Sequence, residues 1–268
     1  MSFLNKDDVK KMSYVQLLAS IHEVNRPPGG KDSIRRIVQN TFLTKDSKVL
    51  DVGCNTGYSA FEIAHLVKCH ITGIDISPDM INTARQFKRR NIDSQQVDFL
   101  VADGMNLPFA DGSFDLVISG GSTAFINDKI KALKEYTRVT KTWGFVADIN
   151  FYYKQKAPKE IIAKLNSAMD INIEPWGKDY WMNLYKETEL ELYYTHFNDV
   201  YVPSDDEITT YCTEMSASVN ADADTQCLIK ERLIELMSLF TENHRYLSYG
   251  IFVLRKRNAP EQISLFGS

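Results

Sequence analysis

The chain has few cysteines and no long apolar runs. Four cysteines occur in 268 residues, and none forms a C-x-x-C pair. The spacing of cysteine and histidine matches no zinc module, so we expect four reduced thiols and no metal site. No run of 18 apolar residues occurs, so no membrane span is expected. The first residues lack the apolar centre of a secretory signal, which predicts a cytoplasmic protein.

An excess of positive charge is also missing. The formal net charge is −4, which argues against a nucleic-acid-binding surface over the whole molecule. The basic triplets Lys88-Arg89-Arg90 and Arg255-Lys256-Arg257 are expected to be solvated ends of a helix and a strand. Apolar residues make up 44% of the chain and charged residues 25%. This composition is typical of a globular protein, and the length suits one α/β domain with insertions.

Strand-like and helix-like segments alternate after residue 48. Short apolar runs bounded by Gly and Asp alternate with segments of helical periodicity. Strands are expected at 48–53, 70–75, 97–102, 114–119 and 144–150, and helices at 57–67, 78–90 and 127–140. This alternation predicts a parallel sheet with helical crossovers.

The flanking segments are more irregular. A helix is expected at 7–24, a break at Pro27–Gly30, and a second helix up to Phe42. After Phe151 the chain is rich in aromatic residues. Further helices are expected at 158–170, 188–195 and 226–242, and strands at 198–202 and 246–256.

The first strand runs into a glycine turn. Asp51 ends the apolar run, and Gly53, Asn55 and Gly57 follow before a helix. Glycine lets the backbone approach a ligand closely, and the start of the helix presents N–H groups to it. A carboxylate at this place would repel a pyrophosphate, but it suits a ligand with a cationic amino group.

Two more acids follow the second and third strands. Asp75 stands where a carboxylate accepts hydrogen bonds from ribose hydroxyls. Asp103 precedes Gly104 and Met105, so it is placed to accept from an adenine amino group while the methionine packs on the ring. Together with the glycine turn, these residues describe a site for adenine, ribose and an amino acid, without phosphate.

Residues 48–151 resemble the Rossmann-like (class I) S-adenosylmethionine-dependent methyltransferases. The glycine turn and the two acids match their first three motifs, and Phe114–Ser119 resembles their fourth strand. Asn55 replaces a glycine, Trp143 a proline or glycine, and His196 a glycine. Asn tolerates positive φ, so we expect binding to survive the first change. The resemblance implies an α/β fold with a seven-stranded sheet, an antiparallel last strand and helical cap insertions.

The resemblance also implies roles for individual residues. The cofactor is S-adenosyl-L-methionine, and its expected contacts are Asp51, Gly53, Asn55, Gly57, Asp75, Ile76, Met80, Asp103, Gly104, Met105, Ser119 and Gly120. The expected division of the chain is N-terminal cap helices at 1–45, the cofactor-binding core at 46–151, a cap insertion at 152–186, core at 187–203, a second cap insertion at 204–244, the last core strand at 245–257 and a tail at 258–268.

The acceptor is less determined. The loop Ser119–Thr123 lacks the Asn/Asp-Pro-Pro-Tyr/Phe and Pro-Cys patterns of enzymes that methylate nucleic-acid bases. An aromatic cap suits a small organic acceptor. The sequence therefore predicts methyl transfer to an N or O atom of a small molecule. The candidate general bases are His22, Tyr14 and His196.

Two alternatives stay open. The first is a tRNA or protein methyltransferase, which a basic groove beside the cofactor would favour. The second is a non-catalytic module that binds the cofactor only, or that docks on a partner through its tail. Gln262–Phe266 resembles the pentapeptide by which bacterial proteins dock on the sliding clamp.

Overall fold

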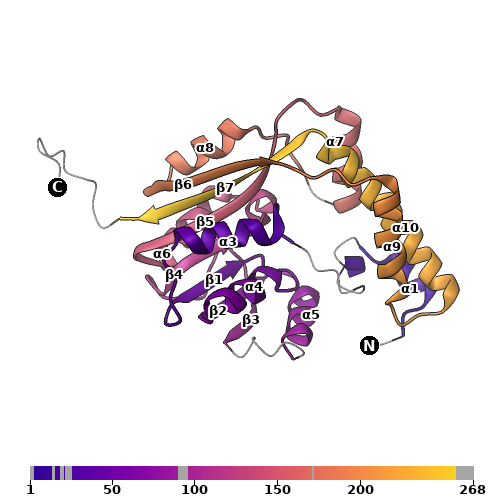
Figure 1. Cartoon of the computed structure of the whole chain (residues 1–268), viewed down its shortest axis with the longest axis horizontal. Helices are drawn as coiled ribbons and strands as arrows, with labels where there is room; N and C mark the ends of the chain where they lie inside the picture. The colour runs from indigo at the N-terminus through magenta and orange to yellow at the C-terminus, as the bar shows by residue number, and fades with distance from the viewer. Residues whose placement is uncertain are drawn as a thin grey trace, which may run out of the picture.

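A seven-stranded mixed sheet forms the centre of the protein (Figure 1). The computed structural model describes residues 3–13, 16–18, 21, 26–89, 96–170 and 172–257. The strands lie in the order β3-β2-β1-β4-β5-β7-β6. Neighbours from β3 to β5 are parallel, whereas β7 is antiparallel to both β5 and β6. This confirms the expected sheet and its antiparallel last strand. The strands are β1 (Lys48–Val52), β2 (His70–Asp75), β3 (Val97–Val101), β4 (Phe114–Ser119), β5 (Thr140–Tyr153), β6 (Leu190–Asp199) and β7 (Leu247–Lys256).

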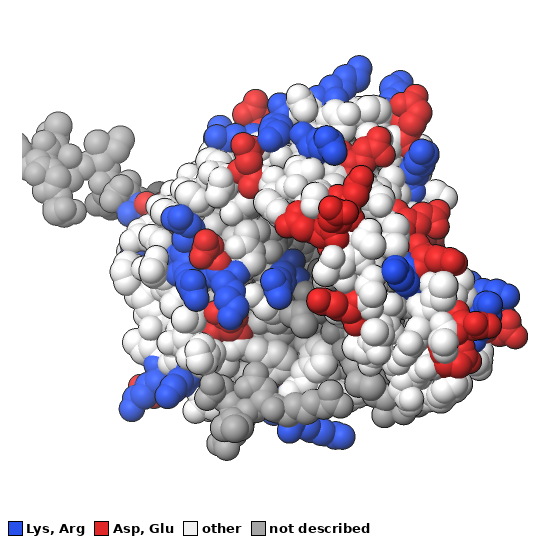
Figure 2. Space-filling view, turned by 45° about the vertical axis from the view of Figure 1, so that its right-hand side comes forward, with Lys and Arg blue, Asp and Glu red and all other residues white. Residues whose placement is uncertain are grey.

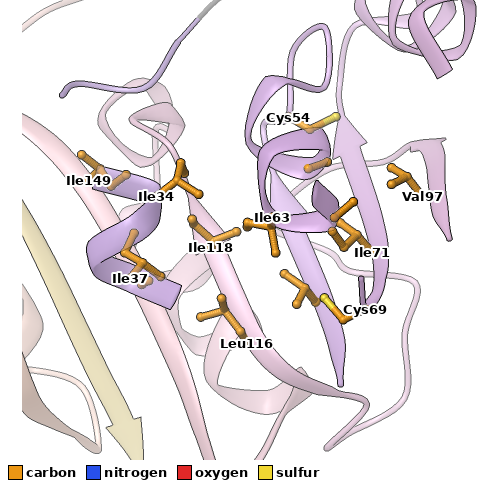
Figure 3. Packing of buried hydrophobic residues seen from close by; sticks show 14 of the residues in the cluster. Ile34, Ile37, Cys54, Ile63, Cys69, Ile71, Val97, Leu116, Ile118 and Ile149 are labelled. Carbon is orange, nitrogen blue, oxygen red and sulfur yellow. The ribbon is translucent and has the colours of Figure 1, made fainter. Parts of the chain in front are cut away.

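Helices cover both faces of the sheet. On one face, α3 (Gly30–Asn40), α4 (Tyr58–Val67) and α5 (Pro78–Lys88) bury isoleucines and alanines against β1, β2 and β4. Figure 3 shows Ile34 and Ile37 beside Ile118 and Leu116 in this layer. On the other face, α6 (Lys129–Val139) and α8 (Lys178–Lys186) pack through Tyr136, Trp181 and Tyr185. Apolar burial on both faces explains why the central strands are nearly continuous apolar runs.

A helical cap lies at one end of the sheet. It consists of α1 (Lys6–Lys11), α9 (Asp205–Ala217) and α10 (Ala223–His244), and α7 (Lys159–Met169) contacts α10 (Figure 1). Its apolar cluster includes Val9, Ile208 and Leu233. Arg232 donates to the backbone carbonyls of Val9 and Met12 and so ties α10 to the end of α1. Within the described residues, no helix is both long enough and apolar enough to cross a bilayer.

Local capping signals fix several helix starts. Ser77 accepts from the Met80 amide, and Pro78 stands at the first helical position of α5. Ser204 and Glu207 form a reciprocal capping box at the start of α9. Asp128 caps α6 through the Lys131 amide. These side chains satisfy backbone N–H groups that have no partner inside the helix.

Three expectations about local structure are wrong. Residues 188–195 were expected to form a helix, but β6 occupies Leu190–Asp199, because pairing with β7 overrides the helical pattern. The expected single helix at 7–24 is interrupted, since α1 ends at Lys11 and Met12 is extended. The strand expected at 198–202 overlaps β6 only at its last two residues, because β6 ends at Asp199. Helices α8 and α9 lie in the segments expected to be helical cap insertions, and they bury Trp181, Tyr185 and Ile208, which shows that tertiary packing stabilises them.

Candidate functional site

The candidate site lies at the carboxyl ends of the central strands. After β1 the chain builds β2 and β3 on one side, and then returns to build β4 on the other side. Val52 pairs with Ser119, and Ser119 pairs with Asp148, so the ends of β1, β4 and β5 are neighbours. Such a reversal of strand order leaves a crevice at the carboxyl edge of an α/β sheet, where ligands bind.

The glycine turn after β1 has left-handed backbone at three positions. The φ angles of Gly53, Asn55 and Gly57 are +67°, +49° and +92°. This confirms that asparagine takes the conformation of the glycine it replaces. A Cβ at Gly53 would lie 2.2 Å from the Cβ of Ser122. The loop after β4 therefore packs directly on the turn, and only glycine fits at residue 53.

Asp51 places an unsatisfied carboxylate beneath this turn. Its side chain is 1% exposed, and Oδ2 has no hydrogen-bond partner. Burial raises its pKa to about 7, and the charge of Asp75 adds to this, although a backbone hydrogen bond from Ala60 opposes it. The hydroxyl of Tyr58, the first residue of α4, is also buried without a partner. Buried polar atoms without partners are costly, so both atoms suit a polar ligand seated on the turn.

Asp75 holds the turn from the neighbouring strand. Its carboxylate accepts from the backbone amides of Asn55 at 3.0 Å and Ser77 at 2.9 Å. Burial raises its pKa, and these backbone hydrogen bonds act in the opposite direction. Ile76 follows with 72% of its surface exposed. The carboxylate therefore has a structural role in addition to the expected ribose contact, and Ile76 is free to contact a ligand.

The segment after β3 forms a capped turn. Oδ1 of Asp103 accepts from the Met105 amide at 2.8 Å. A Cβ at Gly104 would lie 3.0 Å from Cγ1 of Val52, so this turn lies against the end of β1. Met105 packs on the apolar cluster of the α6 face. Met80 lies elsewhere: it is 2% exposed inside the cap cluster, among residues such as Leu17 and Ile229. Its expected cofactor contact stays a prediction.

The loop after β4 meets the proline segment before α3. A Cβ at Gly120 would lie 3.2 Å from Cβ of Pro27, and one at Gly121 would lie 3.6 Å from Cδ of Pro28. The loop continues into a 3-10 turn, η2 (Ser122–Phe125). Ser119 is buried, and its hydroxyl lies 2.9 Å from that of Ser122. The break at Pro27–Gly30 therefore covers the end of β4.

The structure describes one of the three expected general bases, His196. Tyr14 and His22 lie outside the described residues. His196 lies within strand β6, which the sheet order places three strands from β4. Burial lowers its pKa, and the nearby positive charge of Arg36 lowers it further. Its expected place at a helix end is wrong, because that segment is a strand.

Another histidine is closer to the end of β5. His244 ends α10, and its ring centroid lies 5.9 Å from that of Phe151 on β5. Its Nδ1 is buried without a partner, and burial lowers its pKa. The lowered pKa favours the neutral ring, whose unprotonated nitrogen is the one that accepts a proton. No local sequence pattern indicates this residue, because helix α10 brings it to β5 across about 90 residues.

A pocket of about 520 Å³ borders the far side of η2. Phe125 and Lys129 line one wall, and Glu174 and Trp176 line the other. The Lys129 ammonium lies 4.1 Å from the centre of the Trp176 ring, while Tyr180 stacks on this ring at 4.8 Å. Figure 2 shows a hollow on one face of the molecule, with Lys and Arg side chains to its left and acidic side chains above it and to its right.

Three of the described residues in the basic triplets make contacts within the fold. Lys88 pairs with Asp98, and Arg255 lies 4.6 Å over the ring of Trp143. Lys256 donates to the backbone carbonyls of Thr137 and Thr140. These contacts leave little charge for binding phosphates.

Comparisons with known proteins agree with this geometry. Residues 50–147 match the family described as "Methyltransferase domain". An uncharacterised protein of Haemophilus influenzae is 30% identical over 64% of this chain and 69% of its own length. The O-methyltransferase rstn1 of Aspergillus nomiae is 34% identical over 54% of this chain and 65% of its own, so the match spans slightly less than two thirds of that relative. The crystal structure of MccD protein has a TM-score of 0.73 and 26% identity, covering 87% of this chain and all of that one.

Proposed function

This chain belongs to the class I S-adenosylmethionine-dependent methyltransferases, and we propose that it methylates an N or O atom of a small-molecule acceptor. The observation on which this rests most is the unsatisfied Asp51 carboxylate beneath the glycine turn. An ammonium group there would supply the missing partner and favour the ionised carboxylate. S-Adenosylmethionine carries such a group, and the absence of a basic phosphate cradle also suits it.

The residues present fit the cofactor in three parts. Asp51 and the glycine turn would hold its amino-acid end, Asp75 its ribose, and the Asp103–Met105 turn its adenine. When bound, S-adenosylmethionine supplies an electrophilic methyl group on a sulfonium. The protein contributes chiefly by holding the reactants in line and excluding water. Pro27 and the loop Gly120–Ser122 border the end of β4, where the acceptor would approach.

A small acceptor is supported by three features. The pocket beside η2 has the volume of a typical small-ligand site. Figure 2 shows acidic and basic side chains together around the hollow, and this mixture lacks the uniform positive charge of a groove that binds phosphate backbones. Lys88, Arg255 and Lys256 of the basic triplets are occupied by internal contacts. No described feature favours a tRNA acceptor over a small one.

We propose His244 as the general base in place of the residues indicated by the sequence. A hydroxyl or ammonium nucleophile must lose a proton, and a neutral imidazole at the acceptor side is able to take it. Support comes from the unpartnered Nδ1 and from its place against Phe151 at the carboxyl end of β5.

Isothermal titration with S-adenosylmethionine and S-adenosylhomocysteine is the first test. We expect micromolar binding of both. A panel of phenols and amines with radiolabelled methyl donor then tests the acceptor class. A folded sample that binds neither compound would contradict the proposal. Methylation of bulk tRNA, but of no compound in the panel, would replace the small acceptor by a nucleic acid.

A further inference from the structure

A chain of buried polar side chains lies beneath the loop after β4. The Asp148 carboxylate accepts from the hydroxyls of Tyr185 at 2.9 Å and Thr123 at 3.0 Å. The Thr123 hydroxyl also lies 2.9 Å from that of Ser119. Ser119 contacts Ser122, which donates to the carbonyl of Val52 at 2.7 Å. The chain therefore runs from helix α8 through β5 and β4 to the residue before Gly53.

Burial makes this arrangement costly. Asp148, Thr123 and Ser119 are at most 1% exposed, and Tyr185 is 2% exposed. Burial raises the pKa of Asp148 to about 6, although hydrogen bonds from Tyr185, Asn150, Thr123 and Ser119 oppose this. A carboxylate taken out of water is destabilising unless its partners compensate fully. An apolar residue of similar size would pack here without that cost, so packing alone does not explain the carboxylate.

The chain fixes one particular loop. The backbone amide of Thr123 donates to the Ser119 hydroxyl at 3.1 Å, so main-chain and side-chain bonds both hold the start of η2. Gly53 has no room for a Cβ beside Ser122, so the loop and the glycine turn are in direct contact. A shift of η2 would therefore move one wall of the cofactor site.

We infer that Asp148 is a positioning residue, which holds the β4–η2 loop against the glycine turn through Thr123 and Ser119. The inference rests on the proposed function, because the loop matters only if the cofactor binds at that turn. Three titratable groups face Asp148 from the packed elements: Tyr185 of α8, and Tyr136 and Lys129 of α6. Asp148 therefore acts through the loop and does not itself touch the substrate.

The variant Asp148→Asn tests this with little change in volume. Tyr185 already accepts from Nδ2 of Asn150 at 3.0 Å. The carboxylate accepts from Tyr185 through one oxygen and from Thr123 through the other, whereas asparagine has one acceptor oxygen and can replace only one of these two bonds. We expect S-adenosylhomocysteine to bind about five- to tenfold more weakly, and loop amides 121–126 to exchange hydrogen at least tenfold faster. The thermal midpoint should stay level or rise, because a buried charge is removed.

Tyr185→Phe has a matched control in Tyr153→Phe. Both tyrosines donate one hydrogen bond to a buried partner, but Tyr153 bonds Asn243 at 3.0 Å, away from η2. We expect Tyr185→Phe to weaken S-adenosylhomocysteine binding and loosen the loop, and Tyr153→Phe to change neither. In the wild type, loop protection should fall as the pH drops through about 6, whereas Asp148→Asn should show no such step.

The outcomes separate the two proposals. If the wild type binds no S-adenosylhomocysteine, the proposed function fails. If the wild type binds but both network variants bind equally well with unchanged loop exchange, only the positioning role is overturned. A lower thermal midpoint with unchanged affinity and exchange would reduce Asp148 to a structural residue, and would also overturn the inference.

Discussion

The two halves of the site are built in different ways. The cofactor half consists of three short segments, Asp51–Gly57, Asp75–Ser77 and Asp103–Met105, and its hydrogen bonds mostly involve backbone amides. The proposed acceptor half consists of single side chains far apart in the sequence, such as Pro27, Trp176 and His244. A site made from backbone in contiguous motifs tolerates a diverging sequence, whereas one made from distant side chains depends on the whole fold. This contrast explains how one cofactor site serves many acceptors.

The largest expected effect is on the acceptor half. His244→Gln should lower kcat by about 10²- to 10⁴-fold, because it removes the proposed general base. Cofactor affinity should stay within about twofold, since His244 at the end of α10 packs against Phe151 of β5 and not at the glycine turn. Steady-state rates with the best compound of the panel measure kcat, and calorimetry measures the affinity for the cofactor.

His196→Gln is the matched control, because His196 lies three strands from β4. It should leave kcat within about twofold of the wild type. An equal loss in both variants, or a loss only in His196→Gln, would mean that His244 is not the base.

A smaller effect is expected in the cofactor half. Asp75→Ala should weaken S-adenosylmethionine binding by roughly 30-fold and cost about 2–4 kcal/mol in the free energy of unfolding, because two backbone amides lose their acceptor. Calorimetry and denaturant titration measure these quantities. Asp75→Asn keeps one acceptor oxygen, so its cofactor affinity and its free energy of unfolding should lie between those of Asp75→Ala and the wild type. Normal affinity in Asp75→Ala would show that the ribose is held elsewhere.

The third prediction concerns pH. The raised pKa of Asp51, about 7, means that the unliganded protein holds a proton there below neutrality, in competition with the cofactor ammonium. Binding should therefore weaken by about tenfold between pH 8 and pH 6. The same shift means that the unliganded protein loses stability as the pH rises from about 4 through 7. In Asp51→Asn, cofactor binding and stability should both depend less on pH. Calorimetry across pH measures the binding, and thermal unfolding across pH measures the stability.

The smallest effect tests the acceptor class. Bulk tRNA labelled for fluorescence anisotropy should bind more weakly than about 10⁻⁴ M at physiological salt, because Lys88 and Lys256 of the basic triplets make internal contacts. Tight binding with a steep salt dependence would instead place a phosphate-binding surface beside the acceptor half.

The same contrast explains what the sequence predicted. The strands at 70–75 and 114–119 match β2 and β4, and the left-handed Asn55 was anticipated, because both depend on local pattern and local sterics. The hydrogen bond between Tyr185 and Asp148 was not anticipated, because Tyr185 lies 37 residues away on a helix that the sequence did not indicate. The segment 188–195, expected to be a helix, is mostly strand because β7 pairs with it, and no local sequence pattern indicates that pairing. The roles of the cofactor-contacting residues, and the tail Gln262–Phe266 outside the described residues, stay predictions.

Met80 links the cap to the cofactor half and has a consequence for engineering. It belongs to α5, only five residues after Asp75, yet it is buried among Leu17, Ile229 and Leu233 of the cap cluster. A chimera that exchanges the cap for that of another methyltransferase, in order to change its acceptor, therefore creates a new interface at residue 80. Residue 80 and the cap residues that face it have to be exchanged together.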